Sequence, residues 1–125
     1  MHRTYLTLAA SLGCLAVGLG AFGAHGLTTR MASLADGAQR LDWWKTAALY
    51  HLLHALALAL AAGLLGDTRA GKIACAAFTA GIVLFSGSLY TMTLTGIRVL
   101  GAVTPLGGLA LMAGWAALAV AAYRP

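Results

Sequence analysis

Four long apolar stretches, each free of Asp, Glu, Lys and Arg, follow one another along the chain. They cover residues 5–24, 46–66, 73–96 and 99–123, and a Lys or Arg lies beside each of them. A helix needs about 20 predominantly apolar residues to cross the hydrocarbon core of a bilayer, so each stretch is long enough to do so. The pattern predicts an all-α polytopic membrane protein, with four transmembrane helices in an antiparallel bundle and a single domain over residues 1–125. The first stretch exceeds the roughly 7–15 apolar residues of a signal peptide, so we interpret it as a span.

The segment between the first two stretches is amphipathic. Within residues 29–42 apolar residues recur at helical spacing, and this segment is too short to cross the bilayer. Such a pattern is typical of a helix that lies in the membrane interface, which we predict here, with a loop in solution as the alternative. Gly37 opposes a continuous helix, because glycine weakens a helix interior. Trp43 and Trp44 follow, and we expect them to be interfacial anchors because tryptophan favours the headgroup zone.

Composition supports a membrane protein. Hydrophobic residues make up 61% of the chain and charged residues 9%, against about 45–50% and 25% in soluble domains. The net charge is +5, but the basic residues are scattered singly, so no patch for a phosphate backbone forms and no nucleic-acid partner is expected. The expected partners are the lipid bilayer and, beyond it, other membrane proteins or further copies of this chain.

Basic residues flank the spans equally on both sides of the predicted membrane. The side of the two termini has Arg3, Arg69, Lys72 and Arg124, and the other side has Arg30, Arg40, Lys45 and Arg98. Because the first set lies tightly at span ends and is joined by the α-amino group, we expect both termini in the cytoplasm.

Small residues recur at four-residue spacing on the first span. Ala16, Gly20 and Ala24 form one row, and Ala10, Cys14 and Gly18 form a neighbouring row. In lipid, helices associate through close packing of such residues, so the rows predict seams between helices. Cys14 and Cys75 differ in predicted depth by about 10 Å, too far apart for a disulfide.

Polar side chains inside the spans gather in the half of the membrane nearer the two tryptophans. Each is costly there and needs a partner, so these residues are the candidates for a polar cluster. They are His25, Tyr50, His51, His54, Ser86, Ser88, Tyr90, Thr104 and Pro105.

Three interpretations of His51 and His54, which share one helix face, remain open. Both could be neutral and hydrogen-bond across helices. They could ligate haem or a metal. They could also handle a proton or solute in a hydrated cavity. No carboxylate lies inside the spans, so no catalytic constellation is recognisable, and we expect no enzyme activity, cofactor or metal.

Thr104 and Pro105 predict an irregular start to the last span. Proline suits the first turn of a helix, with threonine as its N-cap, so a regular helix would begin at Pro105. The alternative is one long helix kinked near Pro105.

Several local motifs occur together in one order along nearly the whole chain. They are GAFGAHGL at 20–27, TA at 46–47, YHLLHAL at 50–56, FSGSLY at 85–90, TPLGG at 104–108 and GW at 114–115. With these motifs the chain resembles the transmembrane protein 256-like family, also called domain of unknown function 423. The resemblance implies a four-helix protein of the bacterial inner membrane and no activity. The family's motif residues correspond to His25, His54, Ser86, Ser88, Tyr90, Thr104 and Pro105.

The chain departs from this family pattern at position 51. The family often has Gln there, whereas this chain has His51, which argues against a role that needs two histidines. The resemblance and the depth of the polar residues agree, so we hypothesise that the side chains of His25, His54, Ser88, Tyr90 and Thr104 converge in one cluster.

Together these features predict a structural or accessory membrane component. The alternatives are a channel or carrier for a small polar solute or proton, and a haem- or metal-binding membrane protein.

Overall fold

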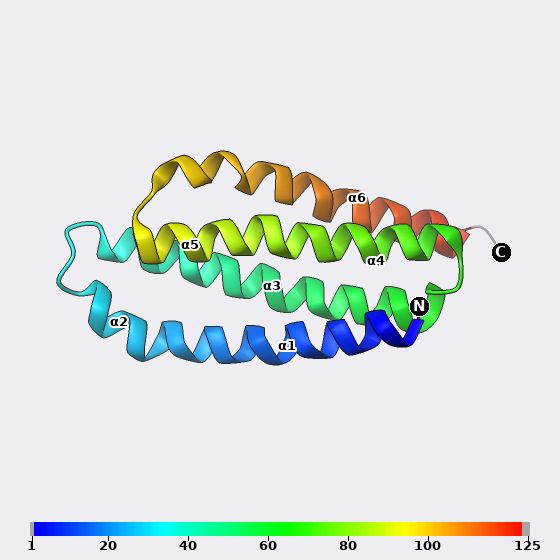
Figure 1. The fold of residues 1–125 in the computed structure, drawn as a ribbon, viewed down its shortest axis with the longest axis horizontal. Coiled ribbons are helices and arrows are strands. Elements are labelled where there is room, and N and C mark those ends of the chain that lie inside the picture. The colour runs from blue at the N-terminus through cyan, green and yellow to red at the C-terminus, as the bar shows by residue number, and fades with distance from the viewer. Residues whose placement is uncertain (1, 124–125) are drawn as a thin grey trace.

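The computed structural model of the chain describes residues 2–123, and within them every regular element is a helix (Figure 1). In chain order the helices are α1 (His2–Ala24), α2 (Gly26–Met31), α3 (Gly37–Leu65), α4 (Arg69–Gly81), the π-helix η1 (Ile82–Ser86), α5 (Gly87–Thr95), the 3-10 helix η2 (Arg98–Ala102) and α6 (Thr104–Tyr123).

Four rods in the described part of the chain are long and apolar enough to cross a membrane. They are His2–Ala24, Gly37–Leu65, Arg69–Thr95 and Arg98–Tyr123. The prediction of a four-span helical bundle is therefore confirmed. The second rod has 29 residues and is about 43 Å long at 1.5 Å per residue, so it projects beyond a hydrocarbon core about 30 Å thick.

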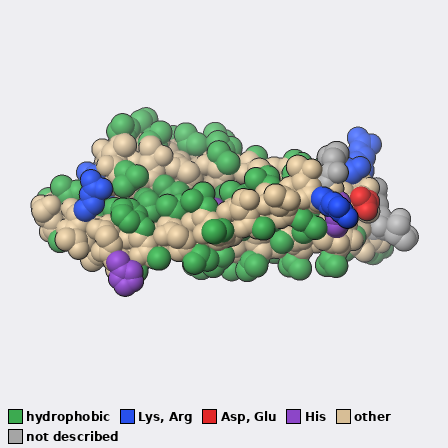
Figure 2. Space-filling view, turned by 60° about the horizontal axis from the view of Figure 1, so that its bottom comes forward, with side chains coloured by type: hydrophobic (Ala, Val, Ile, Leu, Met, Phe, Trp, Pro, Cys, Tyr) green, Lys and Arg blue, Asp and Glu red, His purple; other side chains and the backbone are tan. Residues whose placement is uncertain are grey.

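The rods lie side by side with two in the centre and one on each flank (Figure 1). α1 packs mainly on α3, α6 packs mainly on α4 and η1, and α3 packs on the continuous rod made by α4, η1 and α5. On the face shown in Figure 2, apolar side chains are spread along the middle of the bundle, while Lys and Arg lie towards the two ends. This distribution suits a bundle with its sides in lipid and its ends in the headgroup zones.

Small residues bring the central helices close together. Ala57, Leu58 and Ala61 of α3 pack with Ala74 and Phe78 of α4 in the main core. Two glycines of α6 make close approaches to the rod formed by α4 and the π-helix. A methyl group at Gly107 would overlap the backbone of Phe85, and one at Gly114 would overlap the ring of Phe78. Only glycine therefore fits at position 107, where α6 crosses the π-helix, and Gly114 lies where α6 crosses α4.

The predicted interfacial helix over residues 29–42 is wrong. Residues 26–31 form the short α2, residues 32–36 turn, and α3 begins at Gly37. The turn is closed by the amide of Leu34, which donates to the carbonyl of Met31 (3.0 Å), and by the amide of Gly37, which donates to that of Leu34 (3.1 Å). Any side chain at position 37 would overlap the Met31 carbonyl. The glycine that argued against a continuous helix is thus the residue at which the chain changes direction.

Of the two tryptophans, Trp44 differs from the prediction. Trp44 is 3% exposed and packs with Leu27 and Met31 of α2, and its indole nitrogen donates to the Leu19 carbonyl of α1 (2.7 Å). It joins helices inside the bundle and does not anchor the protein in the headgroup zone. Trp43 is half-buried, with the Arg98 guanidinium 5.2 Å from its ring centre. α3 starts earlier than predicted, so both residues lie within a helix.

The last span starts irregularly before Pro105, as the first of the two predicted alternatives stated, and is not one long kinked helix. A 3-10 helix covers Arg98–Ala102, and the α-helix starts at Thr104, one residue before Pro105. Proline in the first turn needs no amide donor, so the helix begins there without losing a hydrogen bond.

Candidate functional site

The π-helix η1 lies in the half of the bundle that contains the polar side chains. At its end the Gly87 amide donates to the carbonyl of Ile82, five residues back. Segments of this kind are rare and occur frequently at functional sites. Ser86 and Ser88 lie at and just beyond its end, and they face different neighbouring helices.

Ser86 connects the π-helix to α3. Its side chain is 1% exposed, and its hydroxyl donates to the Ala47 carbonyl (2.8 Å). Because the donor is used on a backbone carbonyl, Ser86 acts here as a contact between helices.

Ser88 connects the same region to α6. Its hydroxyl donates to the Phe85 carbonyl (2.9 Å), and its oxygen lies 2.6 Å from the Thr104 hydroxyl. A hydroxyl has one hydrogen, so Thr104 must donate to Ser88. Thr104 was predicted to cap α6, and it instead uses its hydroxyl to hold the start of α6 against α5.

Both ring nitrogens of His54 have a hydrogen-bond partner. Its Nδ1 lies 2.7 Å from the Tyr50 carbonyl, and its Nε2 lies 3.1 Å from the indole nitrogen of Trp115. A carbonyl only accepts and an indole N–H only donates. The hydrogen of the ring is therefore on Nδ1, the lone pair is on Nε2, and His54 is neutral. Neither nitrogen is free for a metal or for proton transfer while Trp115 donates to it.

His51 is only half satisfied. It is 2% exposed, and its Nδ1 lies 3.0 Å from the Tyr90 hydroxyl. Its Nε2 is buried without a hydrogen-bond partner among the described residues, although the backbone of Leu12 on α1 lies beside the ring. An unsatisfied buried polar group costs about 1–3 kcal/mol, so this nitrogen is the conspicuous exception in the bundle.

The predicted polar residues form separate contacts rather than one cluster. His51 meets Tyr90, His54 meets Tyr50 and Trp115, and Ser88 meets Thr104. Several of these side chains use a backbone carbonyl of their own or a neighbouring helix, so they do not need one another. His25 and Pro105 stand apart. Both are exposed, His25 at the junction of α1 and α2 and Pro105 in the first turn of α6.

Two residues that the polar pattern did not single out complete the site. Trp115 supplies the donor for His54, and Trp44 packs its ring 4.6 Å from that of Tyr90. An indole N–H inside a membrane needs an acceptor, and this requirement was the signal in the sequence that could have identified Trp115.

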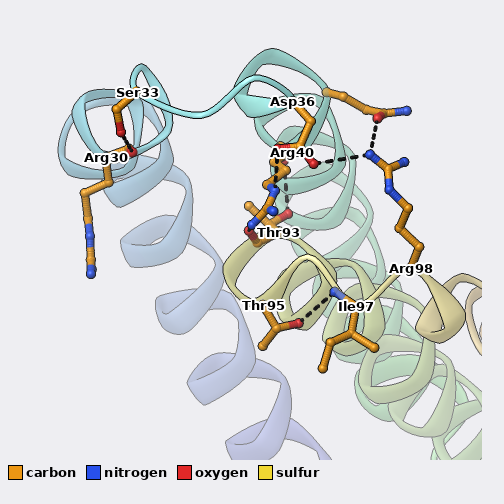
Figure 3. Close-up of polar contacts among 9 residues, drawn as sticks. Arg30, Ser33, Asp36, Arg40, Thr93, Thr95, Ile97 and Arg98 are labelled. Carbon is orange, nitrogen blue, oxygen red and sulfur yellow. Dashed lines mark hydrogen bonds and ion pairs between the residues drawn. The ribbon is translucent and has the colours of Figure 1, made fainter.

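A charged network closes the end of the bundle near the two tryptophans (Figure 3). The Asp36 carboxylate accepts from Nε of Arg40 (3.0 Å) and from Nη2 of Arg98 (3.2 Å). The hydrogen bond from Arg40 is the largest influence on Asp36 and holds the pKa of its carboxyl below the usual value, against the opposing effect of desolvation. Arg40 also donates to the Thr93 carbonyl (3.3 Å), and the Thr93 hydroxyl donates to the Arg40 carbonyl (3.0 Å). The network therefore fixes α3 to α5 and η2 at the membrane surface.

The described residues bring few reactive groups together. No three His, Cys, Asp or Glu side chains among them gather in one place, and Cys14 and Cys75 are free thiols. Within residues 2–123 no carboxylate hydrogen-bonds to His51 or His54. What the arrangement does chemically is hold neutral polar groups against one another between helices.

The family model described as "Protein of unknown function (DUF423)" matches residues 19–108. Relatives align over nearly the full length. The UPF0382 membrane protein YwdK of Bacillus subtilis is 43% identical over 98% of both chains. The UPF0382 inner membrane protein YgdD of Escherichia coli is 41% identical over 98% of this chain and 91% of its own. A UPF0382 membrane protein of Haemophilus influenzae is 37% identical over 99% of this chain and 97% of its own. No solved structure gives a significant match. The chain is a membrane protein that belongs to the DUF423 family.

Proposed function

We propose that the protein is a structural or accessory component of a membrane assembly and that α1 is the helix that meets its partner. The observation that carries this proposal is the low burial of α1. Only 17% of its apolar stretch is buried, against 22% for the Arg98–Tyr123 rod on the other flank, 39% for the α3 rod and 44% for the Arg69–Thr95 rod. α1 packs mainly on α3, so most of its surface is open to lipid or to another protein.

The small residues of α1 support the same proposal. An added methyl group at Gly13, Gly18 or Gly20 would meet nothing within 4 Å, in contrast to Gly107 and Gly114 of α6. Small residues in membrane helices allow close contact between backbones. The glycines of α6 serve this purpose inside the bundle, and those of α1 are available for a further helix, from a second copy or from another membrane protein.

The polar contacts favour an accessory role over the two alternatives. The described polar side chains are used in separate local contacts, which offer a solute or proton no continuous path between the membrane surfaces. Both ring nitrogens of His54 are occupied, which leaves His51 as the one buried histidine with a free nitrogen among the described residues. A haem or metal held by both histidines would require Trp115 to give up its hydrogen bond.

We also propose that the protein lies in the plasma membrane, the inner membrane of bacteria that have two, with both termini in the cytoplasm. The name of the Escherichia coli relative supports the location, and the basic residues that lie tightly at the span ends near the termini support the orientation.

Cross-linking from position 14 tests the role of α1. Cys14 is exposed on α1, so p-benzoylphenylalanine incorporated at position 14 presents a photo-cross-linking ketone from α1 in native membranes. We expect irradiation to give a discrete protein adduct, whose second component mass spectrometry identifies as this chain or another membrane protein.

A matched control places the same label on a different helix. Leu60 of α3 is 53% exposed, so p-benzoylphenylalanine at position 60 presents the same cross-linker to the bilayer from α3. The proposal requires an adduct from position 14 and none from position 60. No protein adduct from position 14, or equal adducts from both positions, would refute it.

A further inference from the structure

We draw no further inference here: the strongest candidate, the apolar groove between α3 and α6 lined in part by Tyr50, His54 and Trp115, carries no proposal because both ring nitrogens of His54 are already hydrogen-bonded and nothing in the structure shows what covers the groove.

Discussion

Replacing Trp115 by Phe tests whether the neutral His54 ring depends on the indole donor. The variant keeps an aromatic ring next to Phe78, whose ring centre is 5.3 Å from that of Trp115. It removes the hydrogen bond to Nε2 of His54 (3.1 Å). His54 is 7% exposed, so in the variant its acceptor has little access to another donor.

Two magnitudes bound the expected loss of stability. A buried acceptor left without its donor costs about 1–3 kcal/mol in soluble proteins. Hydrogen bonds between membrane helices average about 0.6 kcal/mol and reach about 1.7 kcal/mol, because the unfolded chain in the membrane also finds partners. The His54 acceptor is buried and its other nitrogen is already used, so we expect Trp115→Phe to lower the free energy of unfolding by about 1–2 kcal/mol.

The assay is unfolding by SDS in mixed micelles, followed by helical circular dichroism. Trp43→Phe is the matched control, since the Trp43 indole donates no hydrogen bond among the described residues while its ring faces Arg98. A double-mutant cycle with His54→Phe isolates the coupling between the two side chains. If Trp115→Phe costs no more than Trp43→Phe, or if the cycle gives no coupling, the assignment of this hydrogen bond is refuted.

Further predictions concern the glycine contact, the surface network and the orientation. Gly107→Ala forces a methyl group onto the Phe85 backbone, whereas Gly108 has only ordinary contacts, so we expect Gly107→Ala to lose about 1–3 kcal/mol in the same assay and Gly108→Ala to be near neutral. Equal effects would contradict the close crossing. The lowered pKa of Asp36 means that its contribution to stability is present above the usual value of about 3.9 and is lost as the pH falls through the lower, folded value. Thermal midpoints should therefore drop below about pH 4, by less in Asp36→Asn, and an equal drop in both proteins would contradict the network. A green fluorescent protein fused after the last residue should fluoresce and an alkaline phosphatase fusion should be inactive, and the reverse result would place the termini outside the cytoplasm.

The spans could be predicted because continuous apolar sequence needs no knowledge of packing. The four uncharged stretches and the charged residues beside them correspond to the four rods. The start of the last helix was also readable, since Pro105 limits where an α-helix can begin.

Which face of each helix points inward could not be predicted. The membrane-spanning parts of α1 and α6 are apolar almost all round, so the sequence shows no polar stripe that would orient them. On α3 the face shared by His51 and His54 does point inward, but the sequence does not show how the rest of that helix is placed. For this reason Trp44 was expected at the membrane surface and is instead buried, and the small residues Ala10, Cys14 and Gly18 were expected in a seam and are exposed. The partners of the polar residues depend on the same rotations, as His54 and Trp115 show.

The π-helix and the turn before α3 result from contacts between elements distant in sequence or from local backbone geometry. The π-helix borders the point at which Gly107 touches the Phe85 backbone. The turn depends on how Gly37 fits against the Met31 carbonyl. Periodicity carries no signal for either, although glycine at position 37 marked the place.

His54 and Trp115 show how neutral polar side chains inside this bundle are satisfied by their own and neighbouring helices. Solid-state ¹⁵N spectra of histidine- and tryptophan-labelled protein in lipid bilayers test this arrangement most directly. At neutral pH we expect His54 to carry its hydrogen on Nδ1 and Nε2 to show a cross-peak to the Trp115 indole N–H. A protonated Nε2, or a His54 ring that exchanges freely with water, would contradict it.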